Sequence, residues 1–291
     1  MTDAANETAR AIEARDESPH EHGGETGWIE RYVFDFFDDA RKLGGIVAMD
    51  FLPGERRAQS TVSLFLPEGA FATAIAREPN AKRADLKIGR LSIGLQEPLA
   101  RWTLSCKDVA LLFPNARAAA LPAGGQERHG AAAQIAIDLS FTALAPPAGS
   151  ASRKSTMDAN RFMTIVSSGW FAQPGSYNGT VRVGNRSFEV HARGFRERTW
   201  GLPEPAWTRA RIVLADDMAV SIGNNDGETT VFRSGETQTL PARASADGAA
   251  LEVDGIGVID VEPLVTMAGD PQISMARFTA QDVAALGYLQ Q

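Results

Sequence analysis

The sequence has a single cysteine, no excess of basic residues and no long apolar run, and each of these absences excludes a class of protein. Cys106 alone cannot form an internal disulfide or a cysteine-rich zinc site. The chain has 29 Lys and Arg against 36 Asp and Glu, whereas binding to nucleic acids or anionic membranes requires a basic surface. Runs such as VSLFLP and IVLA are far shorter than the ~20 apolar residues that span a bilayer, so we expect no transmembrane segment.

Residues 1–25 lack the basic start and apolar core of a signal peptide. They are rich in Ala, Glu, Asp and Gly, and we predict a disordered tail because they have too little apolar surface to pack. His20 and His22 are interpreted as solvated side chains of this tail, and we expect no metal site. One free cysteine and no export signal predict a cytoplasmic location.

Beyond Trp28 the sequence consists mostly of short runs that alternate apolar and polar residues, separated by Gly, Pro, Asn and Asp. In AQIAIDLSF, for example, Ile135, Ile137, Leu139 and Phe141 share one face, which is typical of a half-buried antiparallel strand. Only AFATAIARE and the C-terminal AQDVAALGYL suggest helices. The pattern therefore predicts a mainly β protein.

The best linker candidate is residues 147–155, which lie in the Pro-, Gly- and Ser-containing run APPAGSASRKS. It separates two β-rich halves, for which we predict domains at 26–146 and 156–291. Many short strands with frequent turns indicate two consecutive antiparallel β-barrels or sandwiches packed together.

The strongest local signal is a hairpin with Gly184 and Asn185 at its turn, a pair that suits a tight two-residue turn. Its second strand continues as RSFEVHARGFRERTWG, and the orientation of two arginines in it stays open. Unbroken alternation places Arg196 and Arg198 on the otherwise apolar face. A bulge at Gly194 would shift the register and turn both arginines outward.

The run WFAQPGSYNGTVRVGNRSFEVHARGFRERTWG resembles the signature of a two-domain lipocalin-like superfamily that includes carotenoid 1,2-hydratases of the hydroxyneurosporene synthase type and AttH-like proteins. The positions that carry the resemblance are Phe171, Ala172, Gln173, Gly179 and the octet GFRERTWG at 194–201. Weaker similarity in WIERYVFDFFD, PLARWTLSCKD and MARFTAQDVAALGYLQQ extends it over nearly all of residues 26–291. The resemblance implies two lipocalin-like barrels and an apolar small-molecule substrate.

Three departures from the family pattern bear on function. The family's glutamate is Ala172 here, and its Asp-His pair is Glu197 followed by Arg198. A histidine exchanges a proton near neutral pH, whereas an arginine is a permanent cation. If that histidine acts as an acid or base in relatives, Arg198 does not do so in the same way here. Glu197 keeps the carboxyl group of the family's aspartate, one methylene further from the backbone.

Glu197 is the candidate general acid, because burial in an apolar barrel raises a carboxyl pKa toward the range needed for protonating a C=C bond. The aromatic faces of Trp170, Phe195 and Trp200 could stabilise a developing carbocation. The alternative is that Glu197 belongs to a solvated charged run near a strand end.

Three other charged residues are candidate substrate-binding groups. Arg196 or Arg198 could hold a polar end of the substrate or the carboxylate of Glu197. Glu30 alternates with aromatic residues and is either a buried carboxylate at the domain interface or an edge-strand charge.

These features lead to a hypothesis of a cofactor-independent hydratase, isomerase or cyclase. It would act on a hydrophobic isoprenoid-like or polyketide-like molecule by carboxyl protonation. The alternative is a non-catalytic, lipocalin-like binder of hydrophobic small molecules, and a third interpretation is an accessory protein with a filled core. Oligomeric state is not indicated by the sequence.

Overall fold

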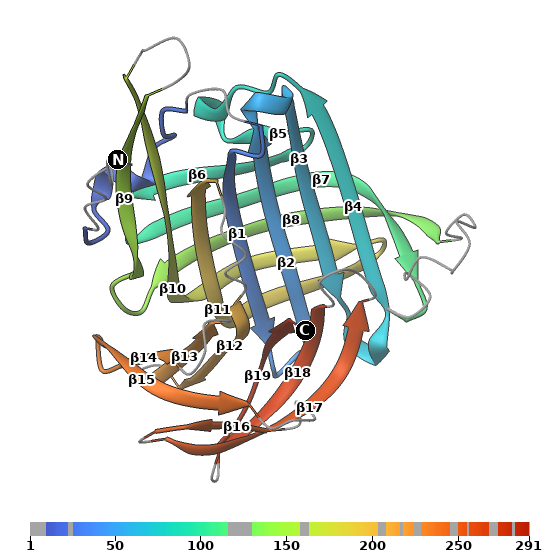
Figure 1. The fold of residues 1–291 in the computed structure, drawn as a ribbon. Helices are drawn as coiled ribbons and strands as arrows, with labels where there is room; N and C mark the ends of the chain where they lie inside the picture. Colours follow the sequence, from blue (N-terminus) through green and yellow to red (C-terminus); the bar gives the residue numbers. More distant parts are fainter. Residues whose placement is uncertain are drawn as a thin grey trace, which may run out of the picture.

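The structure, a computed structural model, describes residues 10–22, 26–115, 130–157, 163–202, 208–215, 218–223, 228–244, 250–254, 256–267, 273–280 and 283–290. Nearly all secondary structure in these ranges is antiparallel β, arranged in two sheets that lie one above the other in Figure 1. The predicted mainly β fold is therefore confirmed. Within the same ranges, no helix combines the length and hydropathy needed to cross a membrane.

The first sheet forms the larger barrel. Its order is β4-β3-β2-β1-β11-β10-β8-β7-β6-β5, β9 pairs with β10, and a pairing of β4 with β7 closes the ring. Its strands are β1 (Ile29–Asp38), β2 (Leu43–Leu52), β3 (Arg57–Phe65), β4 (Phe71–Pro79), β5 (Lys87–Ile88), β6 (Leu91–Glu97), β7 (Arg101–Phe113), β8 (Ala131–Ala143), β9 (Ala148–Met157), β10 (Met163–Val183) and β11 (Arg186–Gly201). Short 3-10 helices flank them: η1 (Ala14–Glu17), η2 (Pro53–Glu55), η3 (Pro67–Gly69) and η4 (Arg83–Asp85).

The second sheet is a smaller closed barrel in which β12 to β19 follow one another in chain order. Its strands are β12 (Thr208–Ala215), β13 (Met218–Gly223), β14 (Glu228–Arg233), β15 (Glu236–Ala244), β16 (Ala250–Val253), β17 (Gly257–Met267), β18 (Ile273–Ala280) and β19 (Val283–Gln290). The two segments that suggested helices form most of β4 and β19 instead, because strand pairing on both sides outweighs local helix preference.

The interior of the first barrel is filled by large apolar side chains from its alternating strands. Tyr32, Phe34 and Phe36 project inward from β1 and belong to one buried cluster with Trp102 and Phe141. Burial of aliphatic and aromatic surface on this scale is the main stabilising contribution to the barrel. The second barrel has a separate core of smaller, mostly aliphatic side chains.

The β10–β11 hairpin crosses the predicted domain boundary. The turn at Gly184 and Asn185 is confirmed, since β10 ends at Val183 and β11 begins at Arg186. The hairpin inserts between β1 and β8 and so belongs to the first barrel, and the predicted linker at 147–155 lies largely within β9. The pattern missed this strand because its apolar anchors are small: Ala148 and Ala151 are buried in apolar clusters, and backbone hydrogen bonds pair the strand with β10.

The predicted disordered tail is also corrected for its described part. Residues 10–22 contain η1, and Arg10 exchanges two backbone hydrogen bonds with Ala151 of β9. This segment, called here the N-terminal plug, lies against the first barrel although it has little apolar surface. Its charged side chains find buried partners in the barrel, which composition alone does not reveal. Residues 1–9 and 23–25 lie outside the described residues.

The strand β11 pairs with β1 and β10 in continuous register through Gly194, so the alternative with a bulge at this glycine is wrong. Gly194 has another role. A Cβ atom there would collide with the backbone carbonyl of Asp35 on the neighbouring strand β1. The glycine therefore allows β1 and β11 to approach closely where both strands carry ionisable side chains.

We predict that Gly194→Ala destabilises the protein by about 2 kcal/mol, because the methyl group must push the backbones of β1 and β11 apart. At an unhindered strand position, the same change is stabilising by ~0.5–1 kcal/mol. Chemical denaturation of the parent and of Gly194→Ala measures the difference in the free energy of unfolding. Ser187→Ala, at an exposed position of the same strand, is the control. A Gly194→Ala protein as stable as the parent would contradict the steric argument.

Candidate functional site

The strand β11 carries ionisable side chains on both of its faces: one face lies inside the first barrel and the other faces the second barrel. Because alternation is unbroken, Arg196 and Arg198 point into the first barrel and are almost completely buried. Glu197, between them, points out toward the second barrel, where it lies 3.4 Å from Arg211 of β12. The charged run of the sequence is therefore neither wholly solvated nor wholly inside one barrel.

Arg196 is held by the N-terminal plug. Its Nη2 and Nη1 atoms donate to the two carboxylate oxygens of Glu17 at 2.5 and 3.0 Å, and its Nε donates to Gln173 at 2.8 Å. The backbone N–H of Leu99 donates to the same carboxylate at 2.9 Å. Rings of Trp102, Phe141 and Phe171 surround the guanidinium group. Arg196 therefore forms a carboxylate-binding site surrounded by aromatic rings, and Glu17 of the same chain occupies it.

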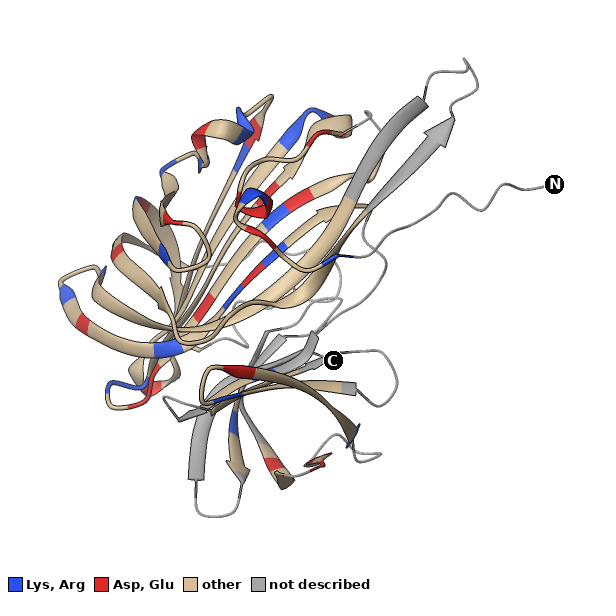
Figure 2. Cartoon of the chain, turned by 90° about the vertical axis from the view of Figure 1, so that its left-hand side faces the viewer, with Lys and Arg blue, Asp and Glu red and all other residues tan. Residues whose placement is uncertain are grey.

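Arg198 forms the second half of the buried network, with Glu30. Its Nη2 donates to Glu30 Oε1 at 2.7 Å, and its guanidinium group lies 3.8 Å from the ring centroid of Tyr32. The backbone N–H of His20 also donates to Oε1, and Arg83 donates to Oε2 at 3.1 Å. Figure 2 shows the plug, with acidic and basic positions, over strands that carry charges of both signs.

Glu30 is thus the predicted buried carboxylate, but it lies at the mouth of the first barrel. It is fully buried and paired, so the interpretation as an edge-strand charge is wrong. His20, interpreted as solvated, has its Nδ1 3.0 Å from Glu30 and its ring stacked on Trp200 at 4.1 Å. Burial alone would raise the pKa of Glu30, but the hydrogen bonds from His20 and the charge of Arg198 lower it to about 2.

Replacing this carboxylate should therefore have a pH-dependent cost. The low pKa of Glu30 in the folded state means that its stabilisation is complete above pH 4.5 and is lost as the pH falls toward 2. We predict that Glu30→Gln lowers the free energy of unfolding by about 3 kcal/mol at neutral pH, and less with each step toward acid.

Denaturation of Glu30→Gln from pH 7 to pH 3 measures this dependence. The control is Glu97→Gln, which removes an exposed carboxylate paired with Arg101 and should cost under ~1 kcal/mol. A cost for Glu30→Gln that does not change with pH would show that packing, and not ionisation, explains its effect.

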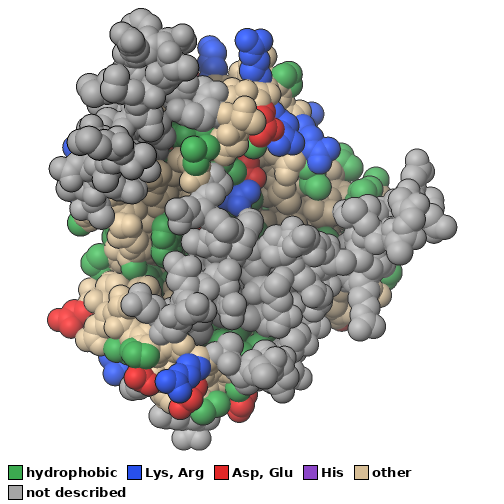
Figure 3. Space-filling view, in the orientation of Figure 1, with side chains coloured by type: hydrophobic (Ala, Val, Ile, Leu, Met, Phe, Trp, Pro, Cys, Tyr) green, Lys and Arg blue, Asp and Glu red, His purple; other side chains and the backbone are tan. Residues whose placement is uncertain are grey.

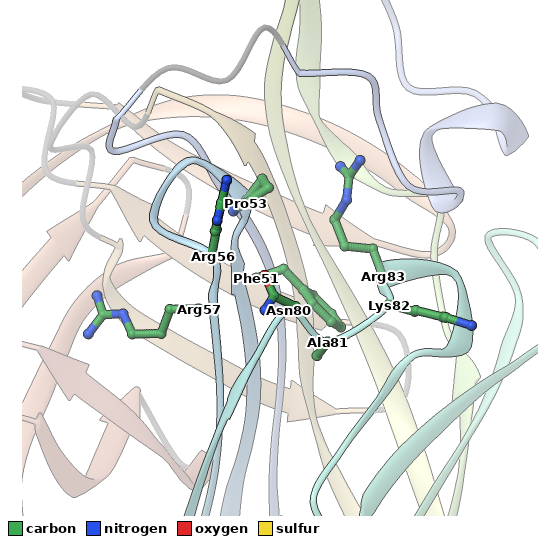
Figure 4. Close-up of a pocket in the computed structure, with 8 residues that line it drawn as sticks. All are labelled: Phe51, Pro53, Arg56, Arg57, Asn80, Ala81, Lys82 and Arg83. Atoms are coloured by element: carbon green, nitrogen blue, oxygen red, sulfur yellow. The ribbon is translucent and has the colours of Figure 1, made fainter.

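A solvent-exposed pocket borders this network. It has a volume of about 330 Å³ and is lined by Phe51, Pro53, Arg56, Arg57, Asn80, Ala81, Lys82 and Arg83 (Figure 4). We call it the basic pocket, because its wall carries four cationic side chains and no acidic one. Arg83 belongs both to this wall and to the network, since it also donates to the backbone carbonyl of His20 at 2.6 Å.

A second group of ionisable side chains lies at the junction between the two barrels. Asp35 of β1 and Glu197 of β11 both approach Nη1 of Arg211, at 2.9 and 3.4 Å. The side chain of Asp35 is 4% exposed and that of Glu197 is 18% exposed, so Asp35 is the more deeply buried carboxyl. One oxygen of Asp35 also accepts a hydrogen bond from the backbone N–H of Phe195 at 3.0 Å.

Burial raises the pKa of Asp35 to about 6, with a further contribution from the negative charge of Glu197. Arg211 and the N–H of Phe195 act in the opposite direction but do not cancel the cost of burial. Among the described residues, Asp35 is thus a buried carboxyl group that exchanges a proton near neutral pH, which is the property required of a general acid.

The junction carboxyls adjoin an apolar cluster contributed by both barrels. Phe195 packs against Phe232 with a centroid separation of 5.8 Å, and Val213 and Ala219 complete the second barrel's side. Trp170 is partly buried against the same cluster. Of the predicted aromatic residues, Phe195 and Trp170 are therefore near the junction. Trp200 lies away from them, at the barrel mouth beneath His20.

Several residues of these two groups were missed by sequence reasoning, among them Arg83 of the mouth network. Asp35 lies in an aromatic strand, and its alternation with Glu30 could have indicated the opposite face, but nothing local reveals that a second barrel covers it. Arg211 carries no signal in ARIVLA. Glu17 and His20 were assigned to a disordered tail. No group of three or more His, Cys, Asp or Glu side chains suited to a metal occurs within the described ranges.

The two charged neighbours of Asp35 predict pKa shifts of opposite sign when each is removed. Glu197→Gln removes a neighbouring negative charge, so we predict that it lowers the pKa of Asp35. Arg211→Met removes the neighbouring positive charge and should raise it. Carbon-detected NMR titration of labelled Asp side chains measures both, against a parent value of about 6. A pKa near 4 for Asp35 in the parent, or pKa shifts of the same sign in the two variants, would contradict this account of its environment.

Comparisons with known proteins agree with the fold. The family model described as "Domain of unknown function (DUF7064)" matches residues 13–209, which cover the first barrel and most of the plug. An AttH-like protein from Nitrosomonas europaea has a TM-score of 0.63 at 14% identity, covering 97% of this chain and 96% of its own. Kievitone hydratase from Nectria haematococca has a TM-score of 0.52 at 12% identity, covering 96% and 92%. No curated protein sequence matches the chain.

The predicted resemblance to AttH-like proteins is thereby confirmed at the level of the fold. The structure adds how the octet at 194–201 is used. Its odd-numbered positions, with Glu197, face the barrel junction, and its even-numbered positions, with Arg198, face the barrel mouth. The position of the family's histidine is thus part of the mouth in this chain, on the face opposite to the junction carboxyls.

Proposed function

The chain belongs to the DUF7064 family, and from the geometry of its barrel junction we propose that it is an acid–base enzyme acting on a hydrophobic small molecule. The observation that carries this proposal is the buried carboxyl group of Asp35, whose pKa is raised to about 6. In this proposal Asp35 takes the role of proton donor that the sequence suggested for Glu197, and Glu197 acts as its partner. The substrate class is an isoprenoid-like or polyketide-like molecule with a carbon–carbon double bond.

The first step is protonation of the substrate. The protonated carboxyl of Asp35 gives its proton to one carbon of the double bond, forming a C–H bond and leaving a carbocation on the other carbon. The new carboxylate is stabilised by Arg211 at 2.9 Å and by the backbone N–H of Phe195. These donors are in place before the reaction, so no reorganisation is needed as the charge develops.

The second step consumes the carbocation. Water adds to the cation and loses one proton to Glu197, which gives hydration, with the proton returning to Asp35 through solvent. Loss of a neighbouring proton to Glu197 would give isomerisation from the same intermediate. Attack by a second double bond forms a C–C bond and a new carbocation, which would lose a proton to Glu197 to complete cyclisation. The aromatic faces of Phe195, Phe232 and Trp170 suit both an apolar substrate and a transient cation.

Two findings support this reaction class over binding alone. Two carboxyl groups share one guanidinium, and the one with the smaller exposed fraction has the raised pKa, which is how paired carboxyls divide acid and base roles. Kievitone hydratase, a hydratase by name, has the same fold. A purely structural ion pair would instead lower the pKa of its buried carboxyl, as at Glu30.

We predict that Asp35→Asn lowers turnover by about 100-fold or more while affinity changes by less than a few-fold. The amide still accepts the hydrogen bond from Phe195 and removes the cost of a buried charge, so stability above pH 6 should not fall. The assay incubates the protein with prenylated and polyketide-type olefins and detects the mass gain of one water, or a new isomer, by mass spectrometry.

The matched control is Asp108→Asn, which removes a carboxylate of β7. For the parent, kcat/KM should decrease as the pH rises above about 6, because Asp35 must be protonated to act. Equal turnover in Asp35→Asn and the parent would falsify the assignment of the acid. Bound olefin without any turnover in the parent would favour the non-catalytic binder.

A further inference from the structure

The N-terminal plug occupies the mouth of the first barrel in the manner of a bound ligand. Two of its side chains make the contacts, one through a carboxylate and one through a planar ring. Glu17 places its carboxylate on Arg196, and His20 places its ring on Trp200. Neither contact is part of the proposed chemistry, which takes place at the barrel junction.

The carboxylate contact has the features of a recognition site. The two oxygens of Glu17 meet a bidentate guanidinium, whose orientation is fixed by Gln173. Gln173 is itself anchored by two carbonyl oxygens, of Leu99 and Ala145, each at 2.8 Å. A planar fork held in this way is suited to any carboxylate, because both N–H···O bonds run parallel.

The ring contact defines a second requirement. The His20 ring is parallel to Trp200, with an interplanar angle of 3° and a centroid separation of 4.1 Å. Its Nδ1 is directed to Glu30, whose carboxylate is held as an anion by its low pKa. A flat ring that carries an N–H or O–H donor satisfies the same two contacts.

The plug leaves several buried donors around the mouth without hydrogen bonds. Within the described residues, Arg198 Nε and Nη1, Tyr32 Oη and Trp102 Nε1 are buried and have no hydrogen-bond partner. Unpaired buried donors of this kind cost free energy, and a polar ligand that accepts hydrogen bonds from them would remove that cost. The mouth therefore offers more donors than the plug has acceptors.

The basic pocket lies beside the plug and favours an anion. It is lined by Arg56, Arg57, Lys82 and Arg83, although the chain as a whole has a net charge of -7. Figure 3 shows basic side chains gathered at this end of the first barrel, at the top of the view. Since Arg83 contacts both the pocket and His20, an anion that enters the pocket reaches the edge of the plug.

We propose that the mouth of the first barrel is a binding site for an aromatic carboxylate bearing a ring donor, for which the plug is an internal substitute. The ligand's carboxylate takes the place of Glu17 on Arg196. Its ring takes the place of His20 on Trp200, with the donor directed to Glu30. Binding displaces residues 10–22 and gives the unpaired donors of Arg198 and Tyr32 access to acceptors.

The test uses the full chain and para-hydroxyphenylacetate, with the matching amide as the neutral probe. Tryptophan fluorescence and calorimetry measure binding to the parent, to Glu17→Ala and to Glu21→Ala. We expect Glu17→Ala to bind the acid at least 10-fold more tightly than the parent, and the amide at least 10-fold more weakly than the acid. Adding Arg196→Met to Glu17→Ala should abolish binding of the acid. Glu21→Ala, which removes an exposed carboxylate of the same plug, should match the parent.

A second variant keeps Glu17 and controls the plug directly. Arg10 and Ala151 form a hydrogen-bonded antiparallel pair, a geometry compatible with a disulfide, so Arg10→Cys with Ala151→Cys should lock the plug when oxidised. The native Cys106 is buried and does not interfere. Reduction should strengthen binding of the acid at least 10-fold. Equal affinity in both redox states, equal affinity for acid and amide, or no binding by folded Glu17→Ala would overturn the proposal.

Discussion

The structure depends on the burial of two guanidinium groups on one strand. Because β11 keeps its alternation through Gly194, Arg196 and Arg198 must enter the first barrel. A buried cation without a counter-charge is strongly destabilising, so each arginine requires a carboxylate within the barrel. Glu30 supplies one from β1, and Glu17 supplies the other from outside the barrel wall. The position of the plug follows from this electrostatic requirement more than from apolar contacts.

The same alternation builds the barrel junction on the opposite face of β11. Glu197 and Phe195 point outward beside Asp35, and the second barrel covers them with Arg211 and an apolar cluster. In the two proposals made above, the two faces of one strand thus separate recognition of a carboxylate at the mouth from proton transfer at the junction. A register shift of one residue would move Arg196 and Arg198 to the junction and Glu197 into the barrel, so that none of them would meet its present partner. The close approach of β1 and β11 at Gly194, where a Cβ atom would collide with the backbone of Asp35, is part of this register.

The parts of this arrangement that follow from short-range pattern could be predicted from sequence. Period-two alternation gave the strands, and Gly184 with Asn185 gave the hairpin. The rest depends on contacts distant in sequence. The composition of residues 147–155 predicts a linker, but the segment pairs with β10 as a strand. The composition of residues 10–22 predicts disorder, but Glu17 in this segment forms an ion pair with Arg196. Alternation places Asp35 on the face opposite to Glu30, but its raised pKa depends on burial beside Arg211 and Glu197, which lie more than a hundred residues later.

Two carboxylates of β1 show how donor geometry decides which of them can react. Glu30 receives the backbone and ring of His20 together with Arg198, and the donors overcome the cost of burial, so its pKa falls to about 2. Asp35 has one backbone N–H and an arginine that it shares with Glu197, and burial prevails. At neutral pH the mouth carboxylate is therefore locked as an anion that can only orient or attract. Of this pair, only the junction carboxyl, with a pKa of about 6, exchanges a proton near neutral pH, and it is therefore the proton donor of the proposed reaction.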